Sequence, residues 1–105
     1  MAIATFSREI YPSVLEKYPN EQIGEIRAAN GCRPIHLLTV REQKIIFYLS
    51  ELGSTLAATD VIDVHWMTGA NKFIMFGSAG ALDKEATTGK YVIPTQAYRD
   101  EGMSY

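Results

Sequence analysis

The chain has 105 residues, of which 47% are hydrophobic and 21% charged, and its formal net charge is -2 at pH 7. This size allows at most one domain, residues 1–105, and the composition is that of an ordinary globular protein rather than a disordered or fibrous one. Ten basic residues against twelve acidic ones leave no cationic excess for a nucleic-acid backbone. We therefore expect no nonspecific nucleic-acid binding.

Cysteine and histidine are too sparse to build disulfide or metal chemistry. Cys32 is the single cysteine, so neither an intramolecular disulfide nor a cysteine-rich zinc site can form. His36 and His65 have no metal-ligand spacing, and His36 is expected to be a strand residue with a backbone partner. The N-terminus lacks the features of a signal peptide, and no apolar run approaches the roughly 18 residues of a membrane span. We expect a cytoplasmic protein with no membrane partner and no cofactor.

A helix is the first element that the sequence predicts. Ser7 can cap it, and it runs through Val14 and Leu15 to Tyr18. Pro12 is expected to disturb its early turns, and the Pro-Asn pair at 19–20 should end it. Phe6 and Tyr11 are expected to be core or interface residues.

Three strands are predicted next. Residues 22–29 and 34–40 form two of them, separated by an Asn30-Gly31 turn signal. A polar link at 41–43 leads to the branched and aromatic run 44–49, which favours the third strand.

A helix follows Gly53, with Ser54 as its capping residue and Gly69 at its end. Asp60 and Asp63 are three residues apart and are expected to face water, while Trp66 and Met67 are expected to pack in the core. The residues expected to form its broad apolar face are Leu56, Ala57, Val61, Ile62, Val64 and Met67.

Lys72 begins a further strand, and 44–76 therefore read as strand, helix, strand. Such a unit predicts parallel pairing with a right-handed crossover, and hence an α/β fold. Residues 83–89 are turn-like, and Tyr91-Val92-Ile93 is expected to form a short strand that Pro94 interrupts or confines to an edge. No capping helix precedes Tyr105, so we expect a fragment of a longer domain.

The stretch most indicative of function is Gly77-Ser78-Ala79-Gly80, because it follows the uncharged run 73–76, which suits a strand covered on both faces. Such a strand delivers its loop to the carboxyl edge of the sheet, where open α/β sheets bind ligands. The glycines permit unusual backbone dihedrals, and Ser78 offers a hydroxyl and an amide to a phosphate, a sugar or a water. Taken alone, the motif favours a tight strand-to-loop connection that binds nothing, and the longer segment in which it lies is what favours a ligand site.

Other nucleotide and hydrolase signatures are missing. The G-x-S-x-G elbow and the G-x-G-x-x-G fingerprint do not occur, and the segment before Gly89-Lys90 lacks the glycine and the Ser or Thr of a phosphate loop.

The segment GSAGALDKEATTGKYVIPTQAYRDEGMSY resembles the middle of the nucleoside phosphorylase and nucleosidase superfamily (purine and uridine phosphorylase-like), and the chain corresponds to its N-terminal portion. The resemblance implies a three-layer mixed sheet and a homo-oligomer. It also implies that Gly77, Ser78, Ala79 and Gly80 bind a nucleoside while phosphate, as co-substrate, cleaves the N-glycosidic bond. Water as the attacking group, or a noncatalytic nucleoside-binding module, stays an alternative, and no catalytic residue is assigned.

The chain departs from the family pattern where phosphate would bind. The early segment Thr5-Phe6-Ser7-Arg8-Glu9 lacks the Gly-Asp turn, Met75 stands where phosphorylases often have arginine, and Glu51-Leu52-Gly53 has lost the first glycine of a Gly-x-Gly. Arginine is the usual phosphate ligand, so a replacement is required for phosphorolysis. The candidates are Arg8, Arg33 and Arg41, whereas Arg99-Asp100-Glu101 reads as a solvated loop or a structural ion pair.

Overall fold

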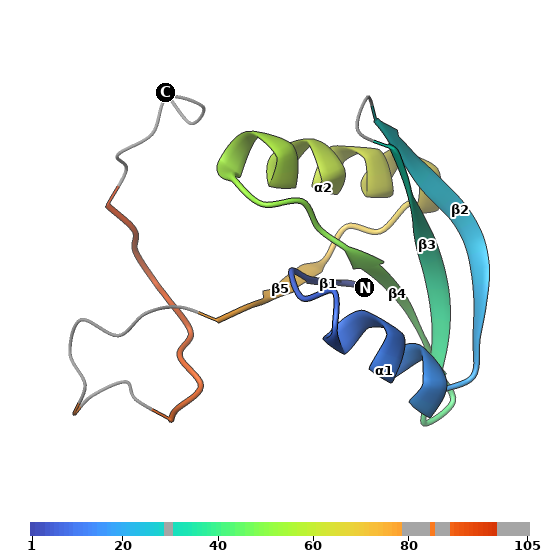
Figure 1. Ribbon diagram of the computed structural model, residues 1–105, viewed down its shortest axis with the longest axis horizontal. Coiled ribbons are helices and arrows are strands. Elements are labelled where there is room, and N and C mark those ends of the chain that lie inside the picture. Colours follow the sequence, from blue (N-terminus) through green and yellow to red (C-terminus); the bar gives the residue numbers. More distant parts are fainter. Residues whose placement is uncertain (29–30, 79–84, 86–88, 99–105) are drawn as a thin grey trace.

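A computed structural model describes residues 1–28, 31–78, 85 and 89–98 (Figure 1). Most of the turn expected at 83–89 and the Arg99-Asp100-Glu101 cluster lie outside the described residues. The elements, in chain order, are β1 (Ala2–Thr5), α1 (Ile10–Lys17), β2 (Asn20–Ala28), β3 (Gly31–Val40), β4 (Gln43–Leu49), α2 (Ser54–Thr68) and β5 (Phe73–Phe76).

The strands form one mixed sheet in the order β2-β3-β4-β1-β5. The pairs β2–β3 and β3–β4 are antiparallel, while β1 pairs in parallel with both β4 and β5. The predicted parallel arrangement of β4 and β5 is confirmed, but β1 lies between them. The sequence did not predict β1, which is nevertheless an internal strand of the sheet.

Short turns join the antiparallel strands. Strands β2 and β3 pair as far as Ala28 and Gly31, beside the expected turn signal, and a register shift between Gln22 and Gly24 leaves Ile23 as an extra residue. The β3–β4 connection is the predicted polar link, in which Arg41 and Glu42 adopt positive φ angles of 48° and 68°. Two successive positive angles match the right-handed twist of the flanking strands.

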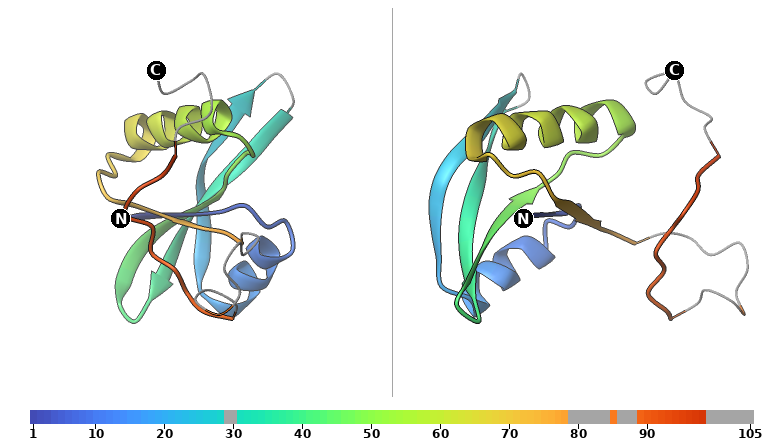
Figure 2. Two further views of the ribbon diagram at one scale, coloured as in Figure 1. Left: turned by 90° about the vertical axis from the view of Figure 1, so that its left-hand side faces the viewer. Right: turned by 180° about the vertical axis from the view of Figure 1, so that it is seen from behind.

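The two helices cover opposite faces of the sheet, which gives the three layers expected (Figure 2). Val64 of α2 packs with Tyr48 on one face, whereas Tyr11 of α1 packs with Leu38 and Phe47 on the other. This division follows from the alternation of side chains along β4, where Phe47 and Tyr48 point to opposite sides.

The helix ends follow local rules. Glu9 occupies the capping position of α1, and Ser7, the expected cap, lies two residues earlier; its Oγ accepts hydrogen bonds from the N–H groups of Glu9 and Ile10 at 3.3 and 3.2 Å and so stabilises the start of the helix. Helix α2 differs, because Ser54 is its first residue and Gly53 occupies the capping position. Gly53 has φ 89° and ψ 149°, a conformation essentially restricted to glycine. Gly69 ends the helix in the left-handed conformation, as predicted.

Three expectations about burial and pairing are wrong within the described residues. Strand β5 lies at the sheet edge, and its Ile74, Met75 and Phe76 are 45 to 49% exposed rather than covered on both faces. The predicted broad apolar face of α2 is partly exposed as well, with Ile62 at 53%. Residues 91–93 pair with no described strand, and Figure 1 shows the segment 89–98 standing apart from the sheet. Among the described residues, no helix is long and apolar enough to cross a membrane.

Candidate functional site

Three parallel strands end together at one edge of the sheet. Thr5, the last residue of β1, is in register with Leu49 of β4 on one side and with Phe76 of β5 on the other. The chain therefore leaves the sheet at neighbouring points after Thr5, Leu49 and Phe76. This carboxyl edge is where open α/β sheets place their ligands, and Gly77-Ser78 lies on it as the sequence predicted.

Gly77 and Ser78 are both exposed, whereas Ala79 and Gly80 lie outside the described residues. We expected Gly77 to permit an unusual backbone dihedral, but its φ angle is not positive, so that expectation is wrong. A Cβ atom at this position would lie 3.1 Å from Cδ2 of Phe6. A side chain at this position would therefore crowd the Phe6 ring, which follows β1 at the same edge and would have to shift slightly to accommodate it.

Two other hydroxyl residues at this edge are buried. Thr5 is 2% and Ser50 is 4% exposed. The Ser50 N–H donates to the Thr5 carbonyl at 2.8 Å, the Ser50 hydroxyl donates to the Glu51 carbonyl at 3.0 Å, and Thr5 Oγ1 accepts from the Ser7 N–H at 3.3 Å. The first of these contacts joins the ends of β1 and β4, and the other two are local, whereas Ser78 is exposed at the same edge.

A cluster of three charged residues, Arg33, Glu51 and Asp60, lies behind this edge. The Arg33 guanidinium donates to both oxygens of Asp60 at 2.8 Å, a bidentate pair whose side chains are 12% and 4% exposed. The Arg33 Nε atom lies 3.2 Å from Glu51 Oε1, an ion pair whose geometry is not that of a hydrogen bond. Asp60 mainly, with a smaller contribution from Glu51, raises the pKa of Arg33.

This cluster overturns two expectations. Asp60 does not face water but is buried by Arg33, which precedes it by 27 residues. Arg33 is in turn held by Asp60 and the Leu49 carbonyl, so it is not free to bind phosphate. Arg41 lies in the β3–β4 turn at the opposite end of these strands. Of the three candidate phosphate ligands, only Arg8, which is exposed just after β1, lies at this edge and outside the cluster.

Neither histidine can activate Ser78. His36 receives or donates a hydrogen bond with the Tyr11 hydroxyl, so its partner is a side chain rather than the expected backbone group. Burial lowers the pKa of His36. His65 Nδ1 lies 2.6 Å from the Ala70 carbonyl, near the start of β5 and hence at the edge away from Ser78. Among the described residues, no group of three or more His, Cys, Asp or Glu side chains could hold a metal ion.

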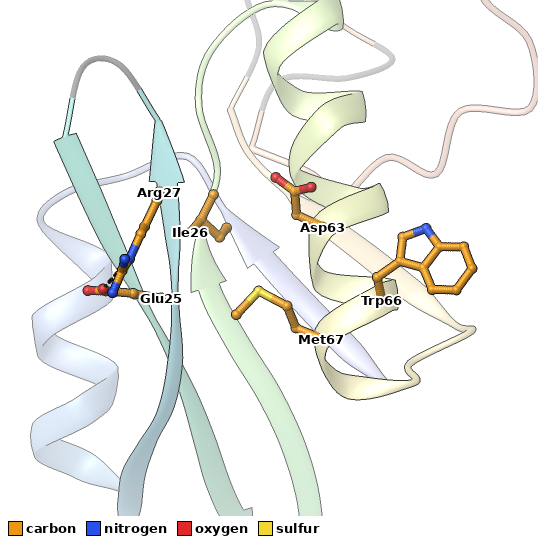
Figure 3. A pocket seen from close by; sticks show the side chains of 6 residues that line it. All are labelled: Glu25, Ile26, Arg27, Asp63, Trp66 and Met67. Atoms are coloured by element: carbon orange, nitrogen blue, oxygen red, sulfur yellow. Dashed lines mark hydrogen bonds and ion pairs between the residues drawn. The ribbon is translucent and has the colours of Figure 1, made fainter.

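Trp66 and Met67 do not pack in the core as expected, since they are 80% and 52% exposed. They line an open groove of about 410 Å³ between β2 and α2, together with Ile26 and three charged side chains (Figure 3). A second hollow of about 310 Å³ lies on the α1 side of the sheet and reaches Thr5 and Phe76. Its lining is almost wholly apolar, and it is the hollow that approaches the carboxyl edge.

The exposed Gly77-Ser78 segment follows a parallel strand at the carboxyl edge of a three-layer α/β sheet, which is where proteins of this architecture usually bind small molecules. A family model described as Phosphorylase superfamily matches residues 1–105, so the chain belongs to that superfamily. This confirms the resemblance drawn from the sequence. A comparison with curated proteins gave no match.

Solved structures share the fold at low sequence identity. Helicobacter pylori MTAN matches with a TM-score of 0.64 and 22% identity, over 82% of this chain and 37% of that one. The native futalosine hydrolase of Helicobacter pylori matches with a TM-score of 0.61 and 23% identity, over 80% of this chain and 35% of that one. The chain thus spans little more than a third of these relatives. Another matching structure is the H. pylori 5'-methylthioadenosine/S-adenosyl homocysteine nucleosidase complexed with a pyrrolo-pyrimidine-bearing pyrrolidinol, at a TM-score of 0.61.

Proposed function

We propose that the protein binds a nucleoside at the carboxyl edge through residues 77–80 and takes part in cleavage of its N-glycosidic bond. The observation that carries the proposal is the exposed Gly77-Ser78 segment at the end of β5, beside the ends of β1 and β4, in a member of the Phosphorylase superfamily. The Ser78 hydroxyl and amide are suited to a sugar hydroxyl or to the attacking group. The apolar hollow that reaches Phe76 offers adjoining surface to a base.

The chemistry proposed is that of the superfamily. The sugar becomes oxocarbenium-like as the bond to the base breaks, and a nucleophile attacks its anomeric carbon. Hydrogen-bond donors fixed beside the reacting centre stabilise the charge that develops there. In this proposal the Ser78 segment binds and orients, and no described residue is assigned a catalytic role.

Water is the attacking group that we favour. Phosphate is held by cations, and Arg33 is already paired with Asp60 while Arg41 lies at the other end of the sheet. Met75 contributes no charge to β5. The solved relatives include a nucleosidase and a futalosine hydrolase, which is in keeping with hydrolysis.

Phosphate is the second candidate, and Arg8 is the observation that favours it. This arginine is exposed in the turn after β1, the strand next to β5. A guanidinium there can approach an anion bound beside Ser78. If phosphate is the attacking group, Arg8→Gln should abolish the release of base that depends on phosphate. Arg41→Gln, the matched control at the opposite edge, should leave that release unchanged.

The test is release of free base from uridine, inosine, adenosine and methylthioadenosine, with and without phosphate, followed by chromatography. Ser78→Ala should weaken nucleoside binding measured by calorimetry, whereas Ser13→Ala, an exposed serine of α1, should not. Base release without phosphate supports hydrolysis, and release that requires phosphate supports the second candidate. Binding without release indicates a noncatalytic module, and absence of binding refutes the proposal.

A homo-oligomer is also proposed. Ile62 and Trp66 are four residues apart on α2 and therefore share one face, and they are 53% and 80% exposed. Large apolar side chains exposed together are typical of subunit contacts. Light scattering after size-exclusion chromatography should give a mass above one chain, and Trp66→Lys should lower it.

A further inference from the structure

The Arg33 cluster, formed by Arg33, Glu51 and Asp60, surrounds the turn that leads from β4 to α2. We infer that Arg33 and Asp60 are positioning residues, which hold this turn, residues 50–53, in place at the carboxyl edge and thereby shape the ligand site. The inference rests on the proposed nucleoside site for its functional part. Its structural part stands on the contacts alone.

The pair holds the backbone on both sides of Ser50. Arg33 Nη1 donates to the carbonyl of Leu49, the last residue of β4, at 2.8 Å. Asp60 Oδ2, besides its bond to Arg33, accepts from the N–H of Glu51 at 3.0 Å. A strand end and the first turn residue after Ser50 are therefore attached to the same ion pair, which joins β3 to α2.

A short series of contacts links this turn to the Ser78 segment. The Ser50 N–H donates to the Thr5 carbonyl at 2.8 Å, and Thr5 is in register with Phe76 of β5. Phe6, the next residue, is the one whose ring approaches Gly77. A movement of residues 50–51 is consequently transmitted to the end of β1, and from there to both Phe6 and β5.

The chemistry of the pair suits a positioning role better than a stabilising one. Removing two charged side chains from water costs free energy that their attraction only partly offsets, so a buried ion pair is weak evidence for stability. What a planar guanidinium provides is direction, because its donors are fixed in a fork. Here the fork reaches Asp60 and the Leu49 carbonyl at the same time.

The test compares two substitutions in the same helix. Asp60→Asn removes the charge that holds Arg33, whereas Val64→Ala removes buried core methyls one helical turn later without touching the pair. Nucleoside affinity is measured by calorimetry with the four nucleosides above, and amide hydrogen exchange is measured at residues 50–53. We expect Asp60→Asn to weaken binding about tenfold or more, since small misplacements in a site have such effects, and to accelerate exchange at Glu51. Val64→Ala should change neither.

Arg33→Lys provides the same test if Asp60→Asn does not fold. A lysine keeps the charge beside Asp60 but cannot reproduce the fork to Leu49, so binding should weaken and exchange at 50–53 should still increase. Unchanged affinity and exchange in folded Asp60→Asn or Arg33→Lys protein overturns the positioning role. A wild-type protein that binds no nucleoside instead refutes the proposed function, and with it the link to a nucleoside site, so the two failures are distinguishable.

Discussion

The phenol of Tyr48 gives the sharpest test of how the core is built. Tyr48 is fully buried in β4, and its hydroxyl has no hydrogen-bond partner in the part of the chain that the structure describes. Burial, with a smaller contribution from Asp60, raises the pKa of Tyr48 to about 12, while Arg33 acts in the opposite direction. The hydroxyl is therefore a neutral polar group that is shielded from water and makes no hydrogen bond to any described residue.

Replacing this residue by phenylalanine should stabilise the protein. An unsatisfied buried polar group costs about 1 to 3 kcal/mol, and Tyr48→Phe removes that group while leaving the ring in place. We expect the free energy of unfolding to rise by about 1 kcal/mol, measured by urea denaturation. For a domain of this size, that is a rise of roughly 4 to 8 °C in Tm.

Tyr11→Phe is the matched control, because the same atom is removed from a hydroxyl that is bonded. Tyr11 OH contacts His36 Nδ1 and lies 3.3 Å from the Pro34 carbonyl, while its ring stacks on Phe47 at 4.9 Å. This variant should lose about 1 kcal/mol. If Tyr48→Phe also loses 1 kcal/mol or more, the Tyr48 hydroxyl is bonded and the reasoning fails.

Three further predictions concern charge, crowding and pH. Asp60→Asn should lower the free energy of unfolding by about 3 kcal/mol, because it removes the main charged partner of the buried Arg33 guanidinium and leaves only the weaker Glu51 pair. Glu25→Gln, in a pair 36 to 80% exposed, should change it by less than about 1 kcal/mol. Equal losses in urea would contradict the burial argument. Gly77→Ala places a Cβ 3.1 Å from Cδ2 of Phe6 and should weaken nucleoside binding several-fold. Adding Phe6→Leu should restore binding, measured by calorimetry, and a double variant that binds as weakly as Gly77→Ala would contradict the crowding argument. Burial lowers the pKa of His36 in the folded protein, so the stability that depends on a neutral His36 is complete above the unfolded pKa near 6.5 and is lost as the pH falls through the folded pKa. His36→Gln should therefore reduce the fall in the urea midpoint between about pH 8 and pH 5. An equal fall in wild type and variant argues against this role.

Elements with local signals could be predicted from the sequence. The antiparallel pairing of β2 and β3, which extends to Ala28 and Gly31, and the end of α2 at Gly69 both lie beside residues that adopt turn conformations readily. Strand β1 has no such signal, because Ala2–Thr5 is short and contains two alanines, which are poor strand formers. It is a strand because β4 and β5 flank it on both sides.

The wrong expectations about Asp60 and Arg33 also arose because the sequence carries no local signal for contacts between distant residues. Helix spacing places Asp60 and Asp63 near each other but does not say which partner each one meets, and Arg33 comes from a strand far earlier in the sequence. The position of Arg33 at the start of β3 brings it to the end of β4, since the two strands are antiparallel. Only the sheet topology, which no local pattern supplies, would have shown that the two charges meet.

The sheet topology also leaves a single candidate cation, Arg8, to bind phosphate as the attacking group. The ion pair that holds the turn after β4 removes Arg33 from the possible phosphate ligands, and the β3–β4 turn carries Arg41 to the wrong edge. Arg8 is the remaining member of the three, and it follows β1 directly. The charge that would be needed to attract phosphate has thus been used to fix the scaffold, which is why hydrolysis is the simpler proposal for a site built around Ser78.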